Sequence, residues 1–402
     1  METVCEFDRL FSRNVPHIQE KMFLSLDFTS FINCLEVCKS WNDLLISKPF
    51  KKMNKNIFSL EIHTQLIKTA EEGNIDLIHK ILSTFIVDVN RILEMPGTRN
   101  HKMSFTSLAV ASQKGHKHVV QLLLDRGADP NLVVGHSDSG LTSLHIAALT
   151  GHKVVAHLLL DKGAMPNMVS KDGSTSLLLA SGRGHTEVVQ LLLDRGAAVN
   201  MANLYGQTEL HYAAKYGHKD VVQHLLDRGA NPNVADQIGW NPLIYAASLG
   251  CSEPWYAESH RHNDVAQLLL ARGADPNIAD QNGVAPLHYT VYRGNKDFAQ
   301  LLISKGADPN LATANGLTPL FCAVLGLKQR LEHLGPIETQ LLVDAKEEYK
   351  DIIQLLLDNG ANTNIADPDG STPLVYAEDM EYMDIAKILR DHKGKKSNLR
   401  KT

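Results

Sequence analysis

The sequence predicts an all-α solenoid, built from helix-turn-helix units with short hairpin loops and preceded by a small segment of three helices. Three observations predict it. A motif of the Thr-Pro-Leu-His kind recurs along most of the chain, a motif of the Gly-Ala-Asp-Pro-Asn kind closes each recurrence, and the first 50 residues lack both. A single unit of this size cannot bury its own apolar face, so neighbouring units must stack.

The repeat has a ground period of 33 residues. Its opening threonine or the equivalent residue recurs at spacings of 36, 33, 33, 33, 44, 33 and 54 residues. These eight positions are Thr106, Thr142, Thr175, Thr208, Asn241, Ala285, Thr318 and Thr372. A ninth, degenerate unit precedes them over residues 63–90, and the longer spacings predict insertions near 91–105, 251–261 and 326–347.

The residue types within one unit indicate two helices and a turn. In residues 208–233, Thr208 can cap a short helix that Gly217 ends. A second helix carries apolar residues at helical spacing, and Gly229 closes it in the left-handed conformation that glycine adopts at little cost. The Asn-Pro-Asn that follows suits a hairpin loop leading into the next unit.

These residues resemble ankyrin repeats over roughly residues 60–392. The resemblance is carried by Thr-Pro-Leu-His with an alanine pair, a Gly-His step and a closing Gly-Ala-Asp-Pro-Asn, and the best copies lie at 203–233 and 280–310. We therefore assign ankyrin repeats to residues 63–392, a linker to 51–62 and a basic tail to 393–402.

The ankyrin resemblance implies a target protein bound on the concave face, along the hairpin tips and the exposed side of each first helix. Aromatic, arginine and aliphatic side chains at such positions are typical of binding hot spots. The positions projected from the motif are Leu204, Tyr205, Gln207, Lys215, Tyr216, Gln237, Ile238, Trp240, Asn282, Val284, Tyr292 and Arg293. Lys114, Arg183 and Arg293 fall at one equivalent repeat position, which leaves an acidic or phosphorylated target segment as an alternative to a purely apolar one.

The head of the chain, residues 13–50, has its own pattern of three short apolar helices. A segment of this length rarely buries enough surface to stand alone, so something must cover it. One alternative is that it caps the first repeat, and the other is that it docks into the groove of a partner.

The order of residues in the head resembles an F-box, with a proline-led helix, then Met-Phe-Leu-Ser-Leu-Asp, then Val-Cys-Lys-Ser-Trp-Asn-Asp-Leu. The resemblance implies docking on the adaptor subunit of an SCF-type cullin–RING ubiquitin ligase, and through it association with the cullin and RING subunits. The positions that the resemblance implies bind the adaptor are Pro16, Ile18, Met22, Phe23, Leu26, Val37, Cys38, Trp41 and Leu44, and Lys39 also matches the residue order.

Together the two resemblances imply a substrate-recognition subunit, in which the head binds the ligase and the repeats bind the target. The alternative is a non-catalytic ankyrin scaffold or inhibitor whose N-terminal helices only cap the stack. No phosphate-binding loop, nucleophile elbow, zinc-protease or kinase motif occurs, so we expect neither enzymatic activity nor a cofactor.

Composition and charge limit the classes of binding partner and the cellular compartment that we expect for this protein. The net charge of −5 does not favour a nucleic-acid partner, although the basic tail leaves a nuclear or nucleic-acid role as a third alternative. No apolar run is long enough to cross a bilayer, and the N-terminus lacks the pattern of a secretory signal. Five cysteines without a disulfide-framework spacing favour the cytoplasm or the nucleus.

The histidines are candidates for structural positions. Seven of the nineteen stand at fixed repeat positions, so we expect them to bond backbone groups at turns and between units. They are His145, His211 and His288 in the opening helix, and His116, His152, His185 and His218 after the turn glycine.

Two clusters of histidine, cysteine or glutamate residues are candidates for metal sites. His260 and His262, with Cys251 or Glu258, lie in an insertion that we interpret instead as a contact loop carrying Trp255 and Tyr256. The pair Cys34 and Cys38 lacks further nearby ligands, and two small apolar core side chains are the favoured reading. We therefore predict no metal.

Overall fold

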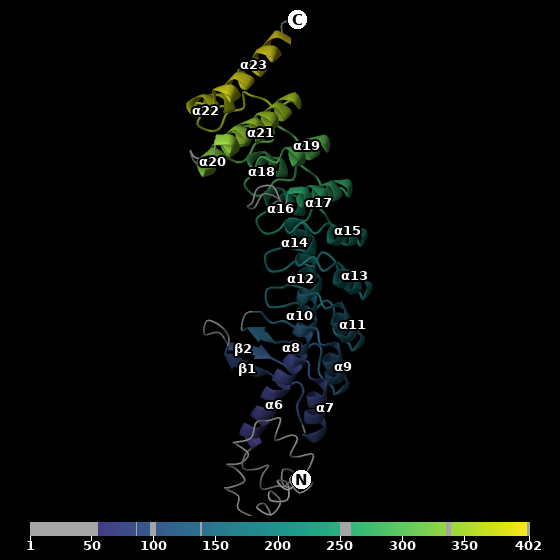
Figure 1. The fold of residues 1–402 in the computed structure, drawn as a ribbon. Coiled ribbons are helices and arrows are strands. Elements are labelled where there is room, and N and C mark those ends of the chain that lie inside the picture. The colour runs from purple at the N-terminus through teal and green to yellow at the C-terminus, as the bar shows by residue number, and fades with distance from the viewer. Residues whose placement is uncertain are drawn as a thin grey trace, which may run out of the picture. The chain divides into compact units, whose positions relative to one another are not determined.

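The computed structural model describes residues 55–85, 87–96, 102–136, 139–249, 259–334 and 339–399. Within these ranges it contains eighteen helices and three short strands (Figure 1). The described residues form two compact units, the first with those up to 143 and 161–163, and the second with 144–160 and those from 164 onward. The head over 13–50 and its adaptor-binding positions lie outside the described residues. No described helix combines the length and apolar character that crossing a bilayer requires.

The first unit contains two helix pairs and a small sheet. The helices are α6 (Lys55–Glu72), α7 (Ile75–Thr84), α8 (Ser107–Lys114) and α9 (Lys117–Asp125), and the strands are β1 (Leu93–Pro96), β2 (Lys102–Phe105) and β3 (Gly135–His136). Helix α6 begins at Lys55, so most of the linker predicted over 51–62 is helical instead. Its apolar residue Ile62 is buried and so belongs to the first repeat.

The sheet occupies the insertion predicted near 91–105, where an all-α prediction has no strand. Strands β1 and β2 pair antiparallel with Leu93 opposite Phe105, and β2 pairs antiparallel with β3. Leu93 packs with Ile67 and Val110 in one apolar cluster, with Phe105 against it. The added residues therefore fold back and bury apolar side chains on the helices of this unit.

The second unit stacks helix pairs in two layers. Figure 1 shows the opening helices α12, α14, α16 and α18 one above another, with α13, α15, α17 and α19 in a second column. The first helices of the pairs are α10 (Ser143–Thr150), α12 (Ser176–Gly182), α14 (Glu209–Lys215), α16 (Pro242–Leu249), α18 (Pro286–Tyr292), α20 (Pro319–Leu334) and α22 (Pro373–Asp379). The second helices are α11 (Lys153–Asp161), α13 (Thr186–Asp194), α15 (Lys219–Asp227), α17 (Ser259–Ala271), α19 (Lys296–Ser304), α21 (Thr339–Asp358) and α23 (Met383–Leu399).

The predicted capping and breaking residues start and end these helices. Thr175 caps α12, its hydroxyl accepting from the amide of Leu178 at 3.1 Å, and Asn241 accepts from the amide of Ile244 at 2.8 Å. Gly217 and Gly229 adopt positive φ angles of 71° and 85°, as the turns after α14 and α15 require. Small alanines let the layers approach closely, and both Ala213 and Ala214 are fully buried.

Histidines in the opening helices bond each repeat to the next, as their periodic positions predicted. His211 Nδ1 accepts from the amide of Thr208 at 3.0 Å, and Nε2 donates to the carbonyl of Trp240 in the next repeat at 3.0 Å. His288 Nδ1 accepts from the amide of Ala285 at 3.1 Å, and its Nε2 donates to the carbonyls of Leu311 and Leu317 at 2.9 and 3.2 Å. Both rings are therefore neutral, with the proton on Nε2.

Histidines after the turn glycines bond in the opposite direction along the chain. His185 Nε2 donates to the carbonyl of Leu149 at 3.2 Å, and His218 Nε2 donates to that of Gly182 at 3.2 Å. Each ring fills the space beside the glycine of the preceding turn, where a Cβ on Gly184 would lie 2.6 Å from His218 Nδ1. These bonds satisfy the carbonyls at the end of each opening helix.

At the joint between α18 and α20, a tyrosine takes the role that His185 and His218 have at earlier joints. The insertion predicted near 326–347 lengthens α20 and α21, and Tyr349 of α21 donates its hydroxyl to the carbonyl of Tyr292 at 2.7 Å. Gly326 allows α20 to touch the Tyr292 backbone, because a Cβ there would collide with the carbonyl oxygen. Arg330, largely buried, pairs with Glu348 at 2.6 Å between the same two helices.

We predict that the second unit loses stability as the pH falls below about 6.5. Burial lowers the pKa of His145, His211 and His288, so the unfolded chain binds protons more readily than the folded chain. Their contribution is complete above the unfolded pKa and is lost as the pH falls through the lowered folded values. The double variant His211→Gln, His288→Gln should show a shallower dependence of unfolding free energy on pH, measured by urea denaturation between pH 7.5 and 5.5. An unchanged slope would contradict the buried neutral rings.

Candidate functional site

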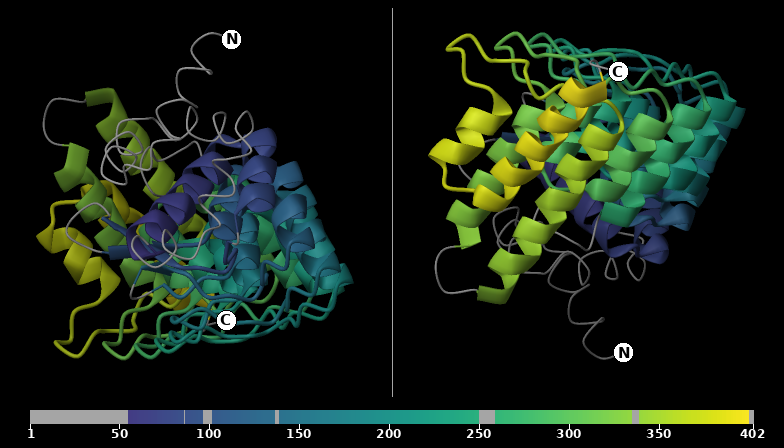
Figure 2. Two further views of the ribbon diagram at one scale, coloured as in Figure 1. Left: turned by 90° about the horizontal axis from the view of Figure 1, so that it is seen from below. Right: turned by 90° about the horizontal axis from the view of Figure 1, so that it is seen from above.

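Five hairpin loops of the second unit, which we call the fingers, project from the ends of the opening helices. Figure 2 shows these loops gathered along one edge. They are residues 170–174, 203–207, 236–240, 280–284 and 313–317. Each is closed by a backbone bond between its first and last residue, as from the amide of Asn203 to the carbonyl of Gln207 at 2.9 Å. Gly206, at φ 79°, lets its finger approach the next, since a Cβ would lie 3.0 Å from the nitrogen of Gln237.

Backbone hydrogen bonds join the tips of neighbouring fingers. The amide of Leu204 donates to the carbonyl of Asp172 at 2.8 Å, and that of Gln237 donates to the carbonyl of Tyr205 at 3.0 Å. The next two joints, Gln281 to Ile238 and Ala314 to Asn282, are bonded at 3.3 and 2.8 Å. The Gln237 side chain adds a bond to the carbonyl of Leu204 at 2.6 Å. The finger tips therefore form one bonded ribbon.

Buried carboxylates brace this ribbon from behind. Asp236 Oδ1 accepts from the amides of Ile238 and Trp240 at 3.0 and 2.9 Å, and its Oδ2 accepts from the hydroxyl of Tyr245 at 2.7 Å. Asp280 Oδ2 accepts from the hydroxyl of Tyr289 at 3.2 Å. Burial first, and then the adjacent carboxylate, raise the pKa of both tyrosines, so their hydroxyls remain proton donors.

Trp240 belongs to this brace. Its indole Nε1 donates to Asp280 Oδ2 at 3.2 Å, and its ring meets Tyr245 and Tyr289 edge to face, with centroids 5.1 and 5.4 Å away. The ring is half-buried. Trp240 is predicted as a target contact, and its bonds also link two fingers to the opening helices beneath them.

The other predicted target contacts divide by exposure. Leu204, Tyr205, Tyr216 and Ile238 are 64%, 59%, 47% and 53% exposed. Gln237 and Asn282 are also exposed at finger tips, while Gln207, Lys215, Val284, Tyr292 and Arg293 are half-buried. Gln207 bonds the hydroxyl of Tyr245 at 2.6 Å and so also serves the brace. Leu204, Tyr205 and Ile238 lie on adjacent bonded fingers and form the exposed apolar part of the surface, which we call the finger patch.

Basic side chains stand at the far ends of the opening helices. Arg183 and Arg293 follow the last residues of α12 and α18, and Lys215 ends α14 with its Nζ 5.3 Å from the ring centroid of Tyr216. None of the three has a carboxylate partner within the described part of the chain. Lys114, at the equivalent position in the first unit, is paired with Glu71 at 3.1 Å and so is neutralised.

Among the described residues, the five fingers and helices α12, α14, α16 and α18 carry one exposed carboxylate, Asp172. Burial raises its pKa, but hydrogen bonds from Ser170 and Ser174 outweigh this and lower it. Its oxygens accept from both serine hydroxyls, so the charge is satisfied within its own finger. The surface offered to a partner is therefore apolar at the fingers and positive at the helix ends.

Glu209 has a structural role that was not predicted from the sequence. It stands where the best repeats have proline, it is fully buried, and its Oε1 accepts from the amide of Asn200 at 2.7 Å. In the neighbouring repeat the equivalent amide, of Asn233, bonds the side chain of Asn231 at 3.0 Å. Ala198, the residue equivalent to Asn231, has no side-chain acceptor, so the carboxyl of Glu209 accepts from the amide of Asn200 instead. Oε2 has no hydrogen-bond partner, and burial raises the pKa of Glu209 to about 6.

His262, predicted to lie in an insertion, occupies the repeat position equivalent to His218. The ring is buried and its Nε2 donates to the carbonyl of Lys215 at 3.0 Å, as His218 does one repeat earlier. Cys251 and Glu258, and the contact-loop residues Trp255 and Tyr256, lie outside the described residues. Within the described ranges no three potential metal ligands come together.

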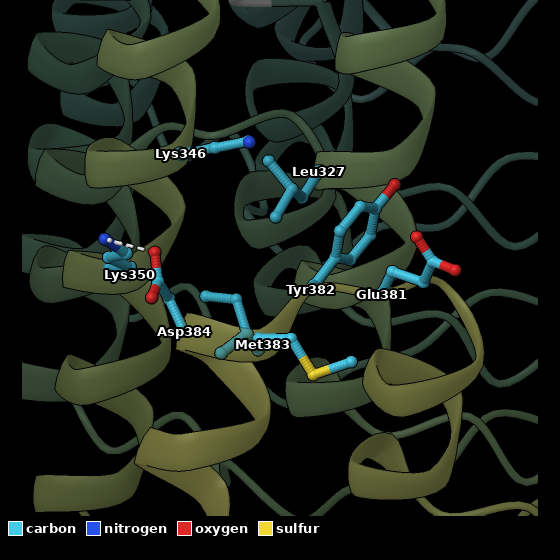
Figure 3. A pocket seen from close by; sticks show the side chains of 8 residues that line it. Leu327, Lys346, Lys350, Glu381, Tyr382, Met383 and Asp384 are labelled. Atoms are coloured by element: carbon cyan, nitrogen blue, oxygen red, sulfur yellow. Dashed lines mark ion pairs between the residues drawn. The ribbon is translucent and has the colours of Figure 1, made fainter.

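A cavity of about 150 Å³ lies between α21 and the turn that joins α22 to α23 (Figure 3). In Figure 3, Lys346 and Lys350 of α21 form one wall, opposite Tyr382 and Met383, with Leu327 between them. Lys350 is paired with Asp384 at 3.2 Å. The cavity arises where α20 continues past the point at which the other opening helices end, and where Glu381, at φ 59°, replaces the turn glycine.

Comparison with known proteins identifies the repeats. The family model for three copies of the ankyrin repeat matches residues 66–169, 110–203, 144–236, 198–253 and 255–335, and the model for a single ankyrin repeat matches 315–368. The chain therefore belongs to the ankyrin-repeat family, whose repeats suggest protein–protein interaction, and the comparison found no catalytic domain. A search of the curated proteins found no match. No F-box family model matches the head.

We predict that Trp240→Ala lowers the free energy of unfolding by about 3 kcal/mol, because it removes a packed ring and leaves a buried carboxylate with one donor fewer. Tyr205→Ala and Ile238→Ala remove exposed side chains and should each change it by less than about 0.5 kcal/mol. Urea denaturation of the three variants checks this. Equal losses in all three would show that Trp240 is no more structural than the finger patch.

We predict that Glu209→Gln stabilises the protein at neutral pH. The folded pKa of Glu209, about 6, lies above its ordinary value of 4.5, so the contribution of the neutral carboxyl is complete below pH 4.5 and is lost as the pH rises through 6. Glutamine keeps the acceptor for Asn200 without ionising. The variant should match the wild type near pH 4.5 and exceed it by about 2 kcal/mol above pH 7. A stability difference that does not change with pH would contradict the raised pKa.

Proposed function

We propose that this chain is a substrate-recognition subunit of an SCF-type cullin–RING ubiquitin ligase. The head over 13–50 would dock on the adaptor subunit through its F-box-like residues, and the ankyrin repeats would bind the target protein. The observation that carries the proposal is the pairing of an F-box-like residue order with a repeat surface that exposes apolar side chains. The first half rests on sequence pattern alone, because the head lies outside the described residues.

The proposed mechanism requires no catalytic residue in this chain. A target held on the fingers is kept near the ubiquitin-charged enzyme that the cullin and RING subunits recruit, which raises its effective concentration there. A bonded ribbon of fingers suits this task, because a rigid surface loses less conformational entropy when a partner binds.

The second candidate is a scaffold or inhibitor whose N-terminal helices only cap the repeat stack. The absence of an F-box family match to the head favours it. Both candidates place the protein in the cytoplasm or the nucleus, in keeping with the buried free thiol of Cys322, whose pKa burial raises to about 12. They differ in one respect, which is whether the head binds the ligase adaptor.

We predict that the full-length chain retains the SCF adaptor subunit in a pull-down of purified proteins. The double variant Phe23→Ala, Trp41→Ala should retain at least about tenfold less, because large apolar side chains dominate the energy of small helical interfaces. Circular dichroism and thermal unfolding must show that the variant keeps its repeats.

The matched control for the pull-down is Tyr205→Ala, Ile238→Ala, which changes two exposed apolar residues of the repeats and should bind the adaptor as the wild type does. Absence of adaptor binding by the folded wild-type chain would reject the ligase proposal and leave the scaffold.

A further inference from the structure

The spacing of the fingers limits the conformations in which a target can contact several of them. Each finger is a narrow hairpin, and its two sides bond to different neighbours, Leu204 to the finger before and Tyr205 to the finger after. Adjacent hairpins bonded in this way repeat every two strand widths, or about 9.6 Å. A target that follows the fingers must therefore present a contact side chain about every 9.6 Å.

A polyproline-II helix meets this spacing. It has three residues per turn and rises about 9.3 Å per turn, so every third side chain returns to the same face. A flat β-strand returns every second residue, after about 6.6 Å, and loses register with the fingers within two repeats. Exposed aromatic rings also favour this conformation, because segments of this kind dock on aromatic-lined grooves, and Tyr205 and Tyr216 are both exposed.

The charges on the surface limit the composition of the target. The finger patch precedes the first residues of the opening helices, and Arg183, Lys215 and Arg293 stand at their C-terminal ends, where none of them pairs with a carboxylate of the described residues. A polyproline-II segment has three faces, so one can contact the patch, the second can contact the basic line and the third can face solvent. The carboxylate of Asp172 is already satisfied by its serines and competes little for an acidic partner.

We infer that the target segment is an extended, acidic peptide with an aliphatic residue at every third position and a carboxylate at one of the two positions between. This deepens the proposed function and rests on its protein-binding half, not on the head. Carboxylates accept paired hydrogen bonds from arginine in fixed geometry, so Arg183 and Arg293 would set the register while Leu204, Tyr205 and Ile238 supply apolar contact.

Selection from a display library of random 12-residue peptides, with the full-length chain as bait, tests the inference. Enriched peptides should show aliphatic residues at a period of three and an excess of aspartate and glutamate. Enrichment at a period of two, at helical spacings of three and four, or with a basic excess would overturn it, as would the absence of any enriched pattern.

Variants then locate the site with the best enriched peptide, synthesised with a fluorophore and measured by anisotropy. Tyr205→Ala, Ile238→Ala should weaken binding at least about tenfold. Arg183→Glu, Arg293→Glu should weaken it by a similar factor and reduce the loss of affinity with added salt, because the exposed charge pairs are screened. Met165→Ala, which removes a 57% exposed apolar side chain outside the fingers, is the matched control and should leave the affinity unchanged.

The outcome is independent of the ligase. A chain that binds the adaptor and selects no acidic period-three peptide loses only the inferred target class. A chain that selects such peptides and fails to bind the adaptor keeps the target class and loses the proposed function.

Discussion

The second unit depends on the joint between neighbouring repeats, because no single pair of short helices can bury its own apolar face. Apolar contact alone would allow adjacent repeats to slide. The joint is fixed instead by hydrogen bonds to backbone carbonyls, which His211 and His288 make forward to the next repeat and His185 and His218 make backward. The forward bonds require a neutral ring, because Nδ1 accepts while Nε2 donates, so the buried His211 and His288 that fix the stack also make it sensitive to acid.

The finger surface follows from these joints. Once the repeats stand in register, the backbone of each finger tip meets the next closely enough to bond, and glycine at the tip becomes necessary. Asp236 and Asp280 then hold the fingers in place. Each carboxylate accepts hydrogen bonds from backbone amides of its own finger and from a tyrosine hydroxyl of the opening helix that follows. Apolar side chains can remain exposed on such loops because the backbone beneath them, and not their own burial, holds them in place.

Much of this architecture could be predicted from sequence because the repeat is encoded locally. Capping threonines, turn glycines and periodic histidines each specify a short-range or next-neighbour contact, and the period was readable directly. What escaped prediction depends on contacts between residues that no motif links. Trp240 stands at a finger position that suggests exposure. Its indole nevertheless donates a hydrogen bond to Asp280, which lies 40 residues later in the sequence. Glu209 stands where other repeats have proline, and the sequence gives no reason for the change. The reason is that Ala198 offers no side-chain acceptor to the amide of Asn200, which Glu209 accepts from instead. The insertion at 93–105 was predicted without strands. It forms an antiparallel strand pair because Leu93 and Phe105 can then pack against Ile67 and Val110 of the neighbouring helices.

The replacement of histidine by Tyr349 at the joint between α18 and α20 has a consequence for the order in which the stack opens. A phenol donates to the Tyr292 carbonyl at every pH at which the protein is folded, whereas the histidine joints weaken as their rings take up protons. The same joint also holds His288, whose Nε2 donates to the carbonyls of Leu311 and Leu317, so acid removes that bond and leaves the phenol bond. Because a linear array separates at its weakest boundary, acid should weaken this joint less than one bridged by histidines alone, such as that between α14 and α16.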